Sequence, residues 1–461
     1  MVVMVITTFY WLSPNRGGPE RGGKRAAGVL KVDGKVIGEE ELRPAEDKVA
    51  PQLGGQTLAA AGQITYAATE QLIEKVLLDK AIKENRIRVS GAEVSRRVSQ
   101  MVEQEMQANF PNRVDLKSYL VRRKLTLEDL KKDLRARQSE SQVEEQLALE
   151  KLRAQVTKGV QVSDEDIKEP FTTVSIRIVP FPWEGGGEAQ AKAKAEEMVG
   201  KARGGADFAP LAEQYGDQKA PKRERARVST LPLQYLPPEV RRPVAQLQPN
   251  QVSDPIKMEN GYYVVQLVEK KVTPPADFEQ KKDSYRSRAL EGKTAEAWDE
   301  YRAALRKKAR VQYLWSSVEA AVAAAKGETD RAIALFQRVE KQAEAEEGVD
   351  LEKVYFSLGS LWEAKGDWVQ AAANYQRAVS EGESAEAYIA LAGALDKQGK
   401  RAEALQALAN AQKQGSDDLY TRSTLASVYR EMGEKALAAE EEAWVEAKQA
   451  EGQTGGPGPG E

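Results

Sequence analysis

The chain has 461 residues and contains neither cysteine nor histidine, with 68 Lys and Arg against 71 Asp and Glu. This composition excludes disulfides, thiolate nucleophiles, thiolate or imidazole metal ligands and Ser-His relays. The formal net charge of −3 gives no overall nucleic-acid signature. The length predicts about three domains. The function must therefore use carboxylate, lysine, tyrosine or backbone groups, and binding is the function class that the composition favours most.

Residues 2–12, VVMVITTFYWL, form an apolar run that is followed by a basic linker. A membrane-spanning helix needs about 20 apolar residues, so the run is too short to cross a bilayer. We interpret residues 1–27 as the remaining end of a signal anchor with its linker, and a frayed apolar N-terminus is the alternative. The basic residues after the run favour a cytoplasmic location for the chain that follows it, and this conflicts with export. Membrane tethering through this segment is therefore an expectation.

Residues 28–170 are expected to form a helical domain that starts with a hairpin. The hairpin spans 28–42, with Asp33-Gly34 as a two-residue turn. Helical spacing from 65 to 84 predicts one buried face. Capping-box spacings at Ser90 and Thr126 mark two further helix starts, and we expect the helix after Thr126 to continue to Leu152. The buried face of the 65–84 helix consists of Leu72, Ile73, Val76, Leu77 and Ala81.

Residues 171–272 change to the period-two pattern of strands and predict a small α+β domain. Its strands are expected at 173–181 and 260–270, with helices and a Pro-rich basic loop between them. A long helix from 276 to 310, with Trp298 and Tyr301 on one face, then leads to residue 315. We expect segment 273–315 to pack back on the helical domain.

Residues 316–450 contain a repeat with a period near 34. Glycines are followed five residues later by alanine, and four residues after that usually by a bulky residue. The small residue lets two helices approach, and the bulky one fills the next groove. The pattern resembles the tetratricopeptide repeat, with residues 357–379 as the best copy. Residues 451–461 read as a disordered tail. The repeat positions are Gly327, Gly366, Gly399 and Gly433; Ala332, Ala371, Ala404 and Ala438; and Phe336, Tyr375, Leu408 and Glu442.

Aromatic residues gather in the best copy of the repeat, at Tyr355, Trp362, Trp368 and Tyr375. Packing between paired helices explains them better than a ligand pocket does. The concave face of such an array is nevertheless expected to hold an extended segment of a protein partner.

Several segments together resemble the SurA and PrsA type of bacterial foldase. VDGKVIGEEEL and EQLIEKVLLDKAIKENRIRVSGAEVSRRV are similar to that family's opening hairpin and first helices. VSIRIVPF, AEEMVGKARGGADFAPLAEQYGD and ENGYYVVQLVEKK are similar to a parvulin-type peptidyl-prolyl isomerase domain. The resemblance covers about residues 28–312. It implies binding of unfolded clients outside the cytoplasm.

The positions that carry the family's catalytic chemistry are altered. Arg177 stands where the resemblance implies a first-strand histidine, and Tyr263 stands where it implies the last-strand histidine. Leu236 takes the place of the pocket methionine, and Val240 that of an aromatic residue. Residues 223–234 hold no counterpart of the family's Asp or Cys. No catalytic residue is assigned, and isomerase activity is doubtful.

Two alternatives stay open for the replaced pair. Arg177 and Tyr263 either fill structural positions, by hydrogen-bonding each other or completing the sheet core, or they belong to a redirected peptide groove. In the second case Arg177 would bind a carbonyl or carboxylate. The candidate groove consists of Arg177, Leu236, Val240 and Tyr263.

The basic segment 219–227 fits a solvated loop better than an anion site, and it lacks the interleaved aromatics of nucleic-acid binders. No phosphate loop, serine-hydrolase elbow or calcium loop is present in the sequence. No cofactor, metal or nucleic-acid partner is therefore expected.

The sequence predicts a multidomain, mainly α protein with one small parvulin-like α+β domain and a C-terminal α-helical solenoid. The expected function is that of an extracytoplasmic foldase-type chaperone that binds unfolded client polypeptides, with a degenerate isomerase site and a partner-binding repeat array. An active isomerase with a histidine-free site and a membrane-tethered repeat scaffold are the alternatives. The expected segments are 1–27, 28–170, 171–272, 273–315, 316–450 and 451–461.

Overall fold

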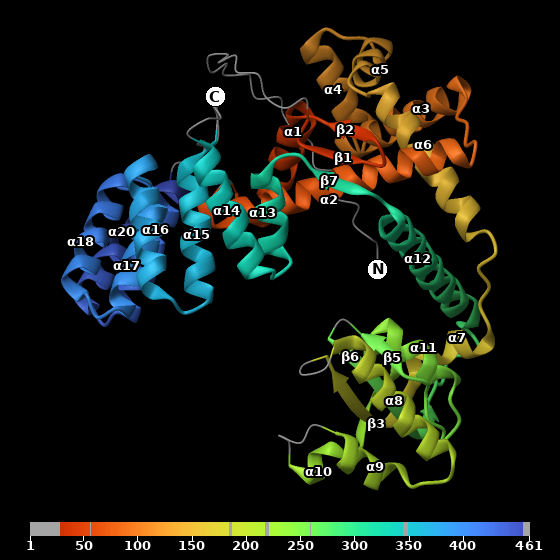
Figure 1. The fold of residues 1–461 in the computed structure, drawn as a ribbon. Helices are drawn as coiled ribbons and strands as arrows, with labels where there is room; N and C mark the ends of the chain where they lie inside the picture. Colours follow the sequence, from red (N-terminus) through yellow and green to blue (C-terminus); the bar gives the residue numbers. More distant parts are fainter. Residues whose placement is uncertain are drawn as a thin grey trace. The chain divides into compact units, whose positions relative to one another are not determined.

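The computed structural model describes residues 28–55, 57–183, 187–216, 221–258, 260–343 and 349–454. Helices dominate these residues, and two small antiparallel sheets accompany them (Figure 1). The mainly α fold class with a small α+β domain is thereby confirmed. The chain divides into a discontinuous unit, Met1–Arg88 with Ala304–Glu461, and a central unit, Val89–Ala303. These boundaries differ from the expected ones near residues 170, 272 and 315. The expected anchor, residues 1–27, lies outside the described residues.

The discontinuous unit begins with the expected hairpin of β1 (Leu30–Val32) and β2 (Lys35–Ile37). Asp33 and Gly34 both have positive φ, at 47° and 97°, as a type I′ turn requires. A third strand, β7 (Val311–Tyr313), pairs antiparallel with β1, so the sheet order is β2-β1-β7. Only long-range pairing creates this strand, which the sequence pattern does not predict.

Helices α1 (Glu39–Val49) and α2 (Leu58–Glu84) follow the hairpin, with a short 3-10 turn, η1 (Ala50–Leu53), between them. The predicted buried face of α2 is confirmed, since Ile73, Val76, Leu77 and Ala81 are buried. Leu72 is partly buried against the same cluster. Helix α2 begins at Leu58, seven residues before the expected start, with Thr57 accepting the Ala60 N–H as N-cap.

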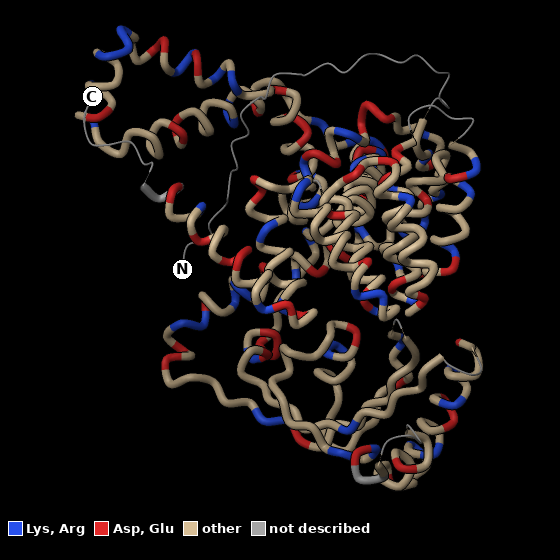
Figure 2. The backbone as a smooth tube through the Cα atoms, turned by 90° about the vertical axis from the view of Figure 1, so that its left-hand side faces the viewer, with Lys and Arg blue, Asp and Glu red and all other residues tan. Residues whose placement is uncertain are grey.

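The C-terminal part is an array of helix pairs, and each pair turns at a glycine with φ between 74° and 81°. The four alanines predicted to allow close helix approach are buried, as are Phe336, Tyr375 and Leu408. Helix α20 continues through Thr454, past the expected start of the tail. Figure 2 shows positive and negative residues interspersed along the helices. The array helices are α13 (Ser316–Ala325), α14 (Thr329–Ala343), α15 (Leu351–Ala364), α16 (Trp368–Gly382), α17 (Ala385–Lys397), α18 (Arg401–Gln414), α19 (Leu419–Glu431) and α20 (Lys435–Thr454).

Helix α2 packs against the first helices of three successive pairs, α13, α15 and α17. Leu58 packs against the apolar core of the array, and Val318 of α13 is buried in the hairpin cluster. The carboxylate of Glu386 accepts hydrogen bonds from the backbone N–H groups of Leu58 and Ala59, at 2.7 and 3.0 Å. The N-terminal hairpin region and the array therefore pack directly against each other.

The central unit begins with helices α3 to α6. The capping boxes at Ser90 and Thr126 are both present. The expectation of one helix from Thr126 to Leu152 is wrong, because Ser139 accepts the Gln142 N–H and starts a separate helix there. Helices α3 and α6 are joined by a two-point ion pair between Arg97 and Glu150. The bounds are α3 (Gly91–Asn109), α4 (Arg113–Arg123), α5 (Leu127–Ala136) and α6 (Glu140–Thr157).

The rest of the central unit is an antiparallel sheet of order β4-β3-β6-β5 with helices on both faces. The two expected strands are present as β3 and β6, which pair along nearly their whole length. The long helix is α12, which is shorter at both ends than expected. The remaining elements are α7 (Asp164–Lys168), η2 (Glu169–Phe171), β3 (Thr172–Pro182), α8 (Gly187–Arg203), α9 (Phe208–Tyr215), α10 (Lys222–Arg225), β4 (Ser229–Pro232), η3 (Leu233–Tyr235), α11 (Pro238–Gln246), β5 (Ile256–Met258), β6 (Gly261–Val272) and α12 (Lys282–Lys308).

Candidate functional site

The two faces of the central sheet carry separate apolar clusters, because successive strand residues point to opposite sides. We call them the α8-side cluster and the α11-side cluster. The α8-side cluster contains Val179, Phe181, Tyr262 and Val264 together with residues of α8 and α9. The α11-side cluster is formed by Val174, Ile176, Leu233, Leu236, Val240, Val244, Ile256, Val265 and Leu267, with Ile178 and Tyr263 packed against it.

Three of the four predicted groove residues meet in the α11-side cluster. Leu236 and Val240 are only 6% and 4% exposed, and Tyr263 packs beside them. Leu236 and Val240 therefore act as core residues of this face and do not line an open groove. Ile176, which is fully buried, and Ile178 reach the same cluster from β3.

Arg177 lies on the other face, so the expectation that it shares one groove with Tyr263 is wrong. It alternates with Ile176 and Ile178 and shares the side of Val179 and Phe181. Its cross-strand partner on β6 is Gln266, whereas Tyr263 lies opposite Pro180. The sequence carries a signal for this placement. Val174, Ile176 and Ile178 alternate along the strand, which puts Arg177 on the opposite face.

The polar groups of the predicted pair are each satisfied locally. Arg177 donates from Nε to the Ala226 carbonyl at 3.1 Å and from Nη1 to Gln266 Oε1 at 2.8 Å. The Tyr263 hydroxyl donates to Asn260 Oδ1 at 3.1 Å. The predicted hydrogen bond between Arg177 and Tyr263 is therefore absent, and Arg177 already binds a carbonyl and an amide of its own chain.

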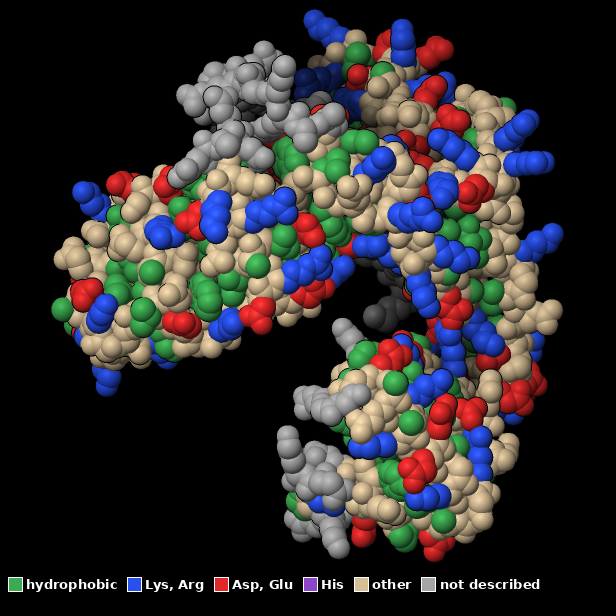
Figure 3. All heavy atoms as spheres, in the orientation of Figure 1, with side chains coloured by type: hydrophobic (Ala, Val, Ile, Leu, Met, Phe, Trp, Pro, Cys, Tyr) green, Lys and Arg blue, Asp and Glu red, His purple; other side chains and the backbone are tan. Residues whose placement is uncertain are grey.

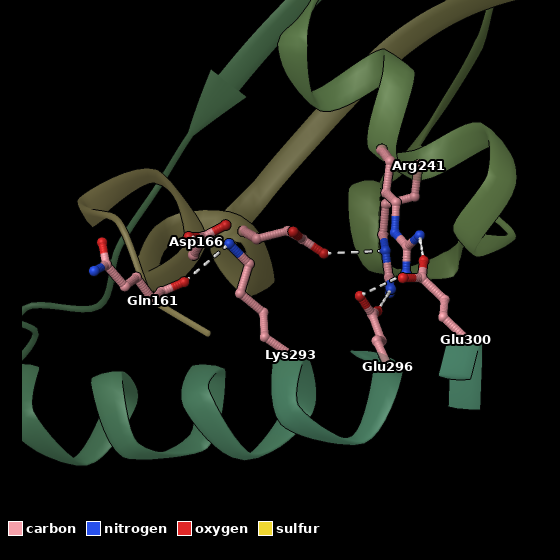
Figure 4. Close-up of polar contacts among 8 residues, drawn as sticks. Gln161, Asp166, Arg241, Lys293, Glu296 and Glu300 are labelled. Carbon is pink, nitrogen blue, oxygen red and sulfur yellow. Dashed lines mark hydrogen bonds and ion pairs between the residues drawn. The ribbon is translucent and has the colours of Figure 1, made fainter. Parts of the chain in front are cut away.

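Helix α11 is fixed on its outer side by ion pairs to α12 and η2 (Figure 4). Arg241 pairs with Glu296 and, at 3.3 Å from Nε, with Glu169. Arg242 pairs with Glu296 at 3.2 Å and with Glu300. Burial raises the pKa of Glu169, and the neighbouring Arg241 opposes that rise. Val240 thus enters the sheet core from a helix that is held on both sides.

A second contact in Figure 4 joins α12 to α7. Lys293 Nζ lies 2.6 Å from Asp166 Oδ2 and donates to the Gln161 carbonyl at 3.4 Å. The Asp166 carboxylate also completes the capping box of α7 with Ser163. Here α12 is tied to the segment that leads into β3.

A surface pocket of about 460 Å³ lies between α8 and the segment before β5. Lys192, Glu196, Arg203 and Asp254 line it, and Arg203 pairs with Asp254 at 2.8 Å. None of the predicted groove residues belongs to its lining. Val199, Gly200 and Pro255 complete the lining, so the pocket has both charged and apolar walls.

The predicted basic segment lies partly outside the described residues, which include neither Lys219 nor the side chains of Lys222 and Arg223. Arg225 donates from Nη1 to the Glu213 carbonyl at 3.2 Å. Within the described part of the chain, acidic side chains form no cluster suited to a metal ion. No described helix combines the length and apolar character needed to cross a bilayer.

Two family models match this chain, a SurA-like N-terminal domain at residues 1–144 and a PPIC-type PPIASE domain at residues 187–283. The chain is 29% identical over 265 residues to "Chaperone SurA" of Ralstonia nicotianae, covering 53% of this chain and 50% of that protein. It is 28% identical over 220 residues to "Foldase protein PrsA 3" of Bacillus cereus, covering 47% and 64%. The chain spans about half the length of the curated relatives that it matches.

Solved structures of similar proteins include PrsA of Bacillus anthracis, with 22% identity, coverage of 52% of this chain and 96% of that one, and a TM-score of 0.23. A SurA-like chaperone of Campylobacter jejuni has 16% identity, coverage of 63% and 100%, and a TM-score of 0.29.

The matched regions are a SurA-like N-terminal domain and a PPIC-type, parvulin-like isomerase domain. The chain is a homologue of the SurA and PrsA foldases.

Proposed function

We propose that the protein is an extracytoplasmic foldase-type chaperone that holds unfolded polypeptides and whose parvulin domain serves as a scaffold. The observation that carries the second part is the filled α11-side cluster. Its described side chains are aliphatic apart from Met258 and Tyr263, and the Tyr263 hydroxyl is engaged by Asn260.

An isomerase must lower a barrier of about 18–20 kcal/mol for rotation about the peptide bond. Binding the twisted bond requires a cleft that grips the proline ring and its flanking carbonyl. Leu236 and Val240 are buried against Ile176, so the side chains that replace the family's pocket residues close the face instead of opening it. The chain also has no histidine to place there. These features support a degenerate site.

The extracytoplasmic location rests on the similarity to the SurA and PrsA proteins. Membrane tethering through residues 1–27 and recruitment of a partner by the array are further parts of the proposal. The array offers less inner surface for a partner than the sequence suggested, because α2 covers α13, α15 and part of α17. Tyr420, one repeat after Glu386, is 62% exposed and lies on the remaining part.

Two assays on the full chain test the proposal. Aggregation of a chemically unfolded client is followed by light scattering, and we expect suppression at near-stoichiometric amounts of protein. Cis-trans conversion of a short proline peptide is followed by NMR exchange, and we expect no acceleration.

Acceleration that scales with protein concentration, falls in Tyr263→Ala and persists in Arg177→Ala would assign catalysis to the α11 side and overturn the degenerate site. Arg177→Ala is the matched control, because Arg177 lies on the opposite face of the same sheet. Failure to suppress aggregation would overturn the chaperone function and leave a scaffold.

A further inference from the structure

Helix α4 is attached to the central unit by one side only. Leu116, Tyr119 and Leu120 pack against a small cluster that α3 and α5 supply, and the rings of Tyr119 and Phe110 are 5.0 Å apart. None of the eleven residues of α4 is fully buried. The opposite side of the helix is therefore available to another molecule.

The outward side of α4 carries aliphatic residues. Val114 and Val121 are 73% and 71% exposed, and their spacing of seven residues places them on the same side of the helix. Leu125 and Leu127 are exposed just beyond the end of the helix. Val114 and Val121 thus form an exposed apolar strip on the outward side of α4, and the partly exposed Leu125 and Leu127, at 38% and 43%, follow it along the chain.

Basic residues outnumber acidic residues around this strip. Residues 113–124 contain Arg113, Lys117, Arg122, Arg123 and Lys124 but one acidic residue, Asp115, a net charge of five minus one. Asp115 is engaged by the N-cap Asn112. In the part of the chain that the structure describes, none of the five cations has an acidic partner, whereas Lys131 of the neighbouring α5 pairs with Glu103. Lys and Arg side chains stand out over α4 and α5 in Figure 3.

The residue types on this side discriminate between anionic partners. Helices that insert in a lipid interface usually present Trp, Phe or Leu, whereas the outward side of α4 itself presents two valines, one near each end, and no Trp, Phe or Leu. Single-stranded nucleic acids are held by exposed aromatic rings, but Tyr119 is turned inward against Phe110. A polypeptide segment that carries both carboxylates and aliphatic side chains matches the cations and the strip together.

We propose that the outward side of α4 is a docking surface for unfolded segments rich in acidic and aliphatic residues. The inference rests on the proposed chaperone function and names the class of client. Because the cations are exposed, salt screens their attraction over about 8 Å at physiological ionic strength, and binding weakens as salt is added.

The test uses two labelled, unstructured 20-residue peptides with identical Val, Leu and Ser positions, one with Glu and one with Lys at the remaining sites. Binding to the full chain is measured by fluorescence anisotropy at 50 and 500 mM NaCl. We expect the acidic peptide to bind at least 10-fold more tightly at 50 mM, and this preference to shrink at 500 mM.

The triple variant Lys117→Glu/Arg122→Glu/Lys124→Glu should abolish the preference. A control with the same change of charge, Lys194→Glu/Lys397→Glu/Lys435→Glu, should retain it, since these exposed lysines lie on other helices. Val114→Ser/Val121→Ser should weaken the acidic peptide about fivefold without changing the circular-dichroism melting curve.

Equal affinities for both peptides, or a preference that survives the α4 triple variant, would overturn the inference while leaving the chaperone function standing if aggregation is still suppressed. If the unaltered protein neither binds the peptides nor suppresses aggregation, both the docking surface and the chaperone function are overturned. The same protein is tested with vesicles of phosphatidylcholine and phosphatidylglycerol (7:3) and with an oligonucleotide. If it binds one of these and the triple variant does not, while neither peptide is preferred, the inference is overturned in favour of that partner.

Discussion

The Glu386 carboxylate accepts the Leu58 backbone N–H at 2.7 Å, although the two residues are 328 positions apart. One oxygen bonds Leu58 and the other bonds Ala59, so a side chain of the array satisfies two free donors at the start of α2. Negative charge at a helix N-terminus is stabilising, and α2 carries no acidic residue in its own first turn. The array thus supplies the charge that the helix lacks.

Glu386→Gln is expected to loosen the first turn of α2. Loss of the charge should cost about 0.3–1 kcal/mol, equivalent to a two- to fivefold faster exchange of the Leu58 and Ala59 amides if they exchange by local opening. Hydrogen exchange with mass spectrometry of the peptide that spans these residues measures the effect. Glu403→Gln, an exposed change on α18, is the control, and unchanged exchange in Glu386→Gln would contradict the capping role.

Arg241→Gln is expected to reduce the stability of the central unit by about 1–3 kcal/mol, because Glu169 loses its ion-pair partner and Glu296 keeps only Arg242. Arg43→Gln breaks an exposed pair with Glu39 on α1 and should change stability by less than about 0.5 kcal/mol. Urea unfolding curves of the two variants give the comparison. Equal effects would mean that the α11–α12 ion pairs contribute no more than a surface pair.

Arg422 and Glu441 form a nearly buried ion pair between α19 and α20, with exposed side-chain fractions of 11% and 1% and a distance of 2.9 Å. Gln412 donates to the same carboxylate at 2.6 Å. Arg422→Leu alone should destabilise the array by about 3–5 kcal/mol, since it leaves a buried carboxylate unpaired.

The double variant Arg422→Leu/Glu441→Leu should recover most of that loss, because both charges are then removed from the apolar surroundings. Thermal unfolding of the two variants gives the comparison. A double variant that is less stable than the single one would contradict this explanation.

Glu93 gives the clearest pH dependence. Its hydrogen bonds with Lys151, and then with the Ser90 backbone and side chain, lower its pKa from about 4.5 to about 2. A lowered pKa in the folded state means that the contribution to stability is present above pH 4.5 and is lost as the pH falls toward 2. The difference in melting temperature between the wild type and Glu93→Gln should therefore shrink over that range.

Carbon-detected NMR titration gives the Glu93 pKa directly. Lys151→Met should move it upward, because Lys151 is the largest cause of the shift. A midpoint near 4.5 in the unaltered protein would contradict the predicted pH window.

Sequence patterns predicted those elements that depend on residues close together in the chain. The Asp33-Gly34 turn, the capping boxes at Ser90 and Thr126 and the buried face of α2 all depend on residues within a few positions of one another. The repeat glycines and alanines were equally readable, because each helix pair repeats the same packing. The break at Ser139 was missed because a helical period can continue across a cap.

Tertiary structure decided the relations between distant residues. The sequence determined that β3 and β6 would alternate, but the register that sets Arg177 beside Gln266 and the burial of Leu236 and Val240 arise only when the sheet and α11 come together. The pairing of β7 with β1 and the capping of α2 by Glu386 likewise join segments about 280 to 330 residues apart. No local preference specifies such contacts, since their energy comes from shared burial and from donors that must be satisfied once water is excluded.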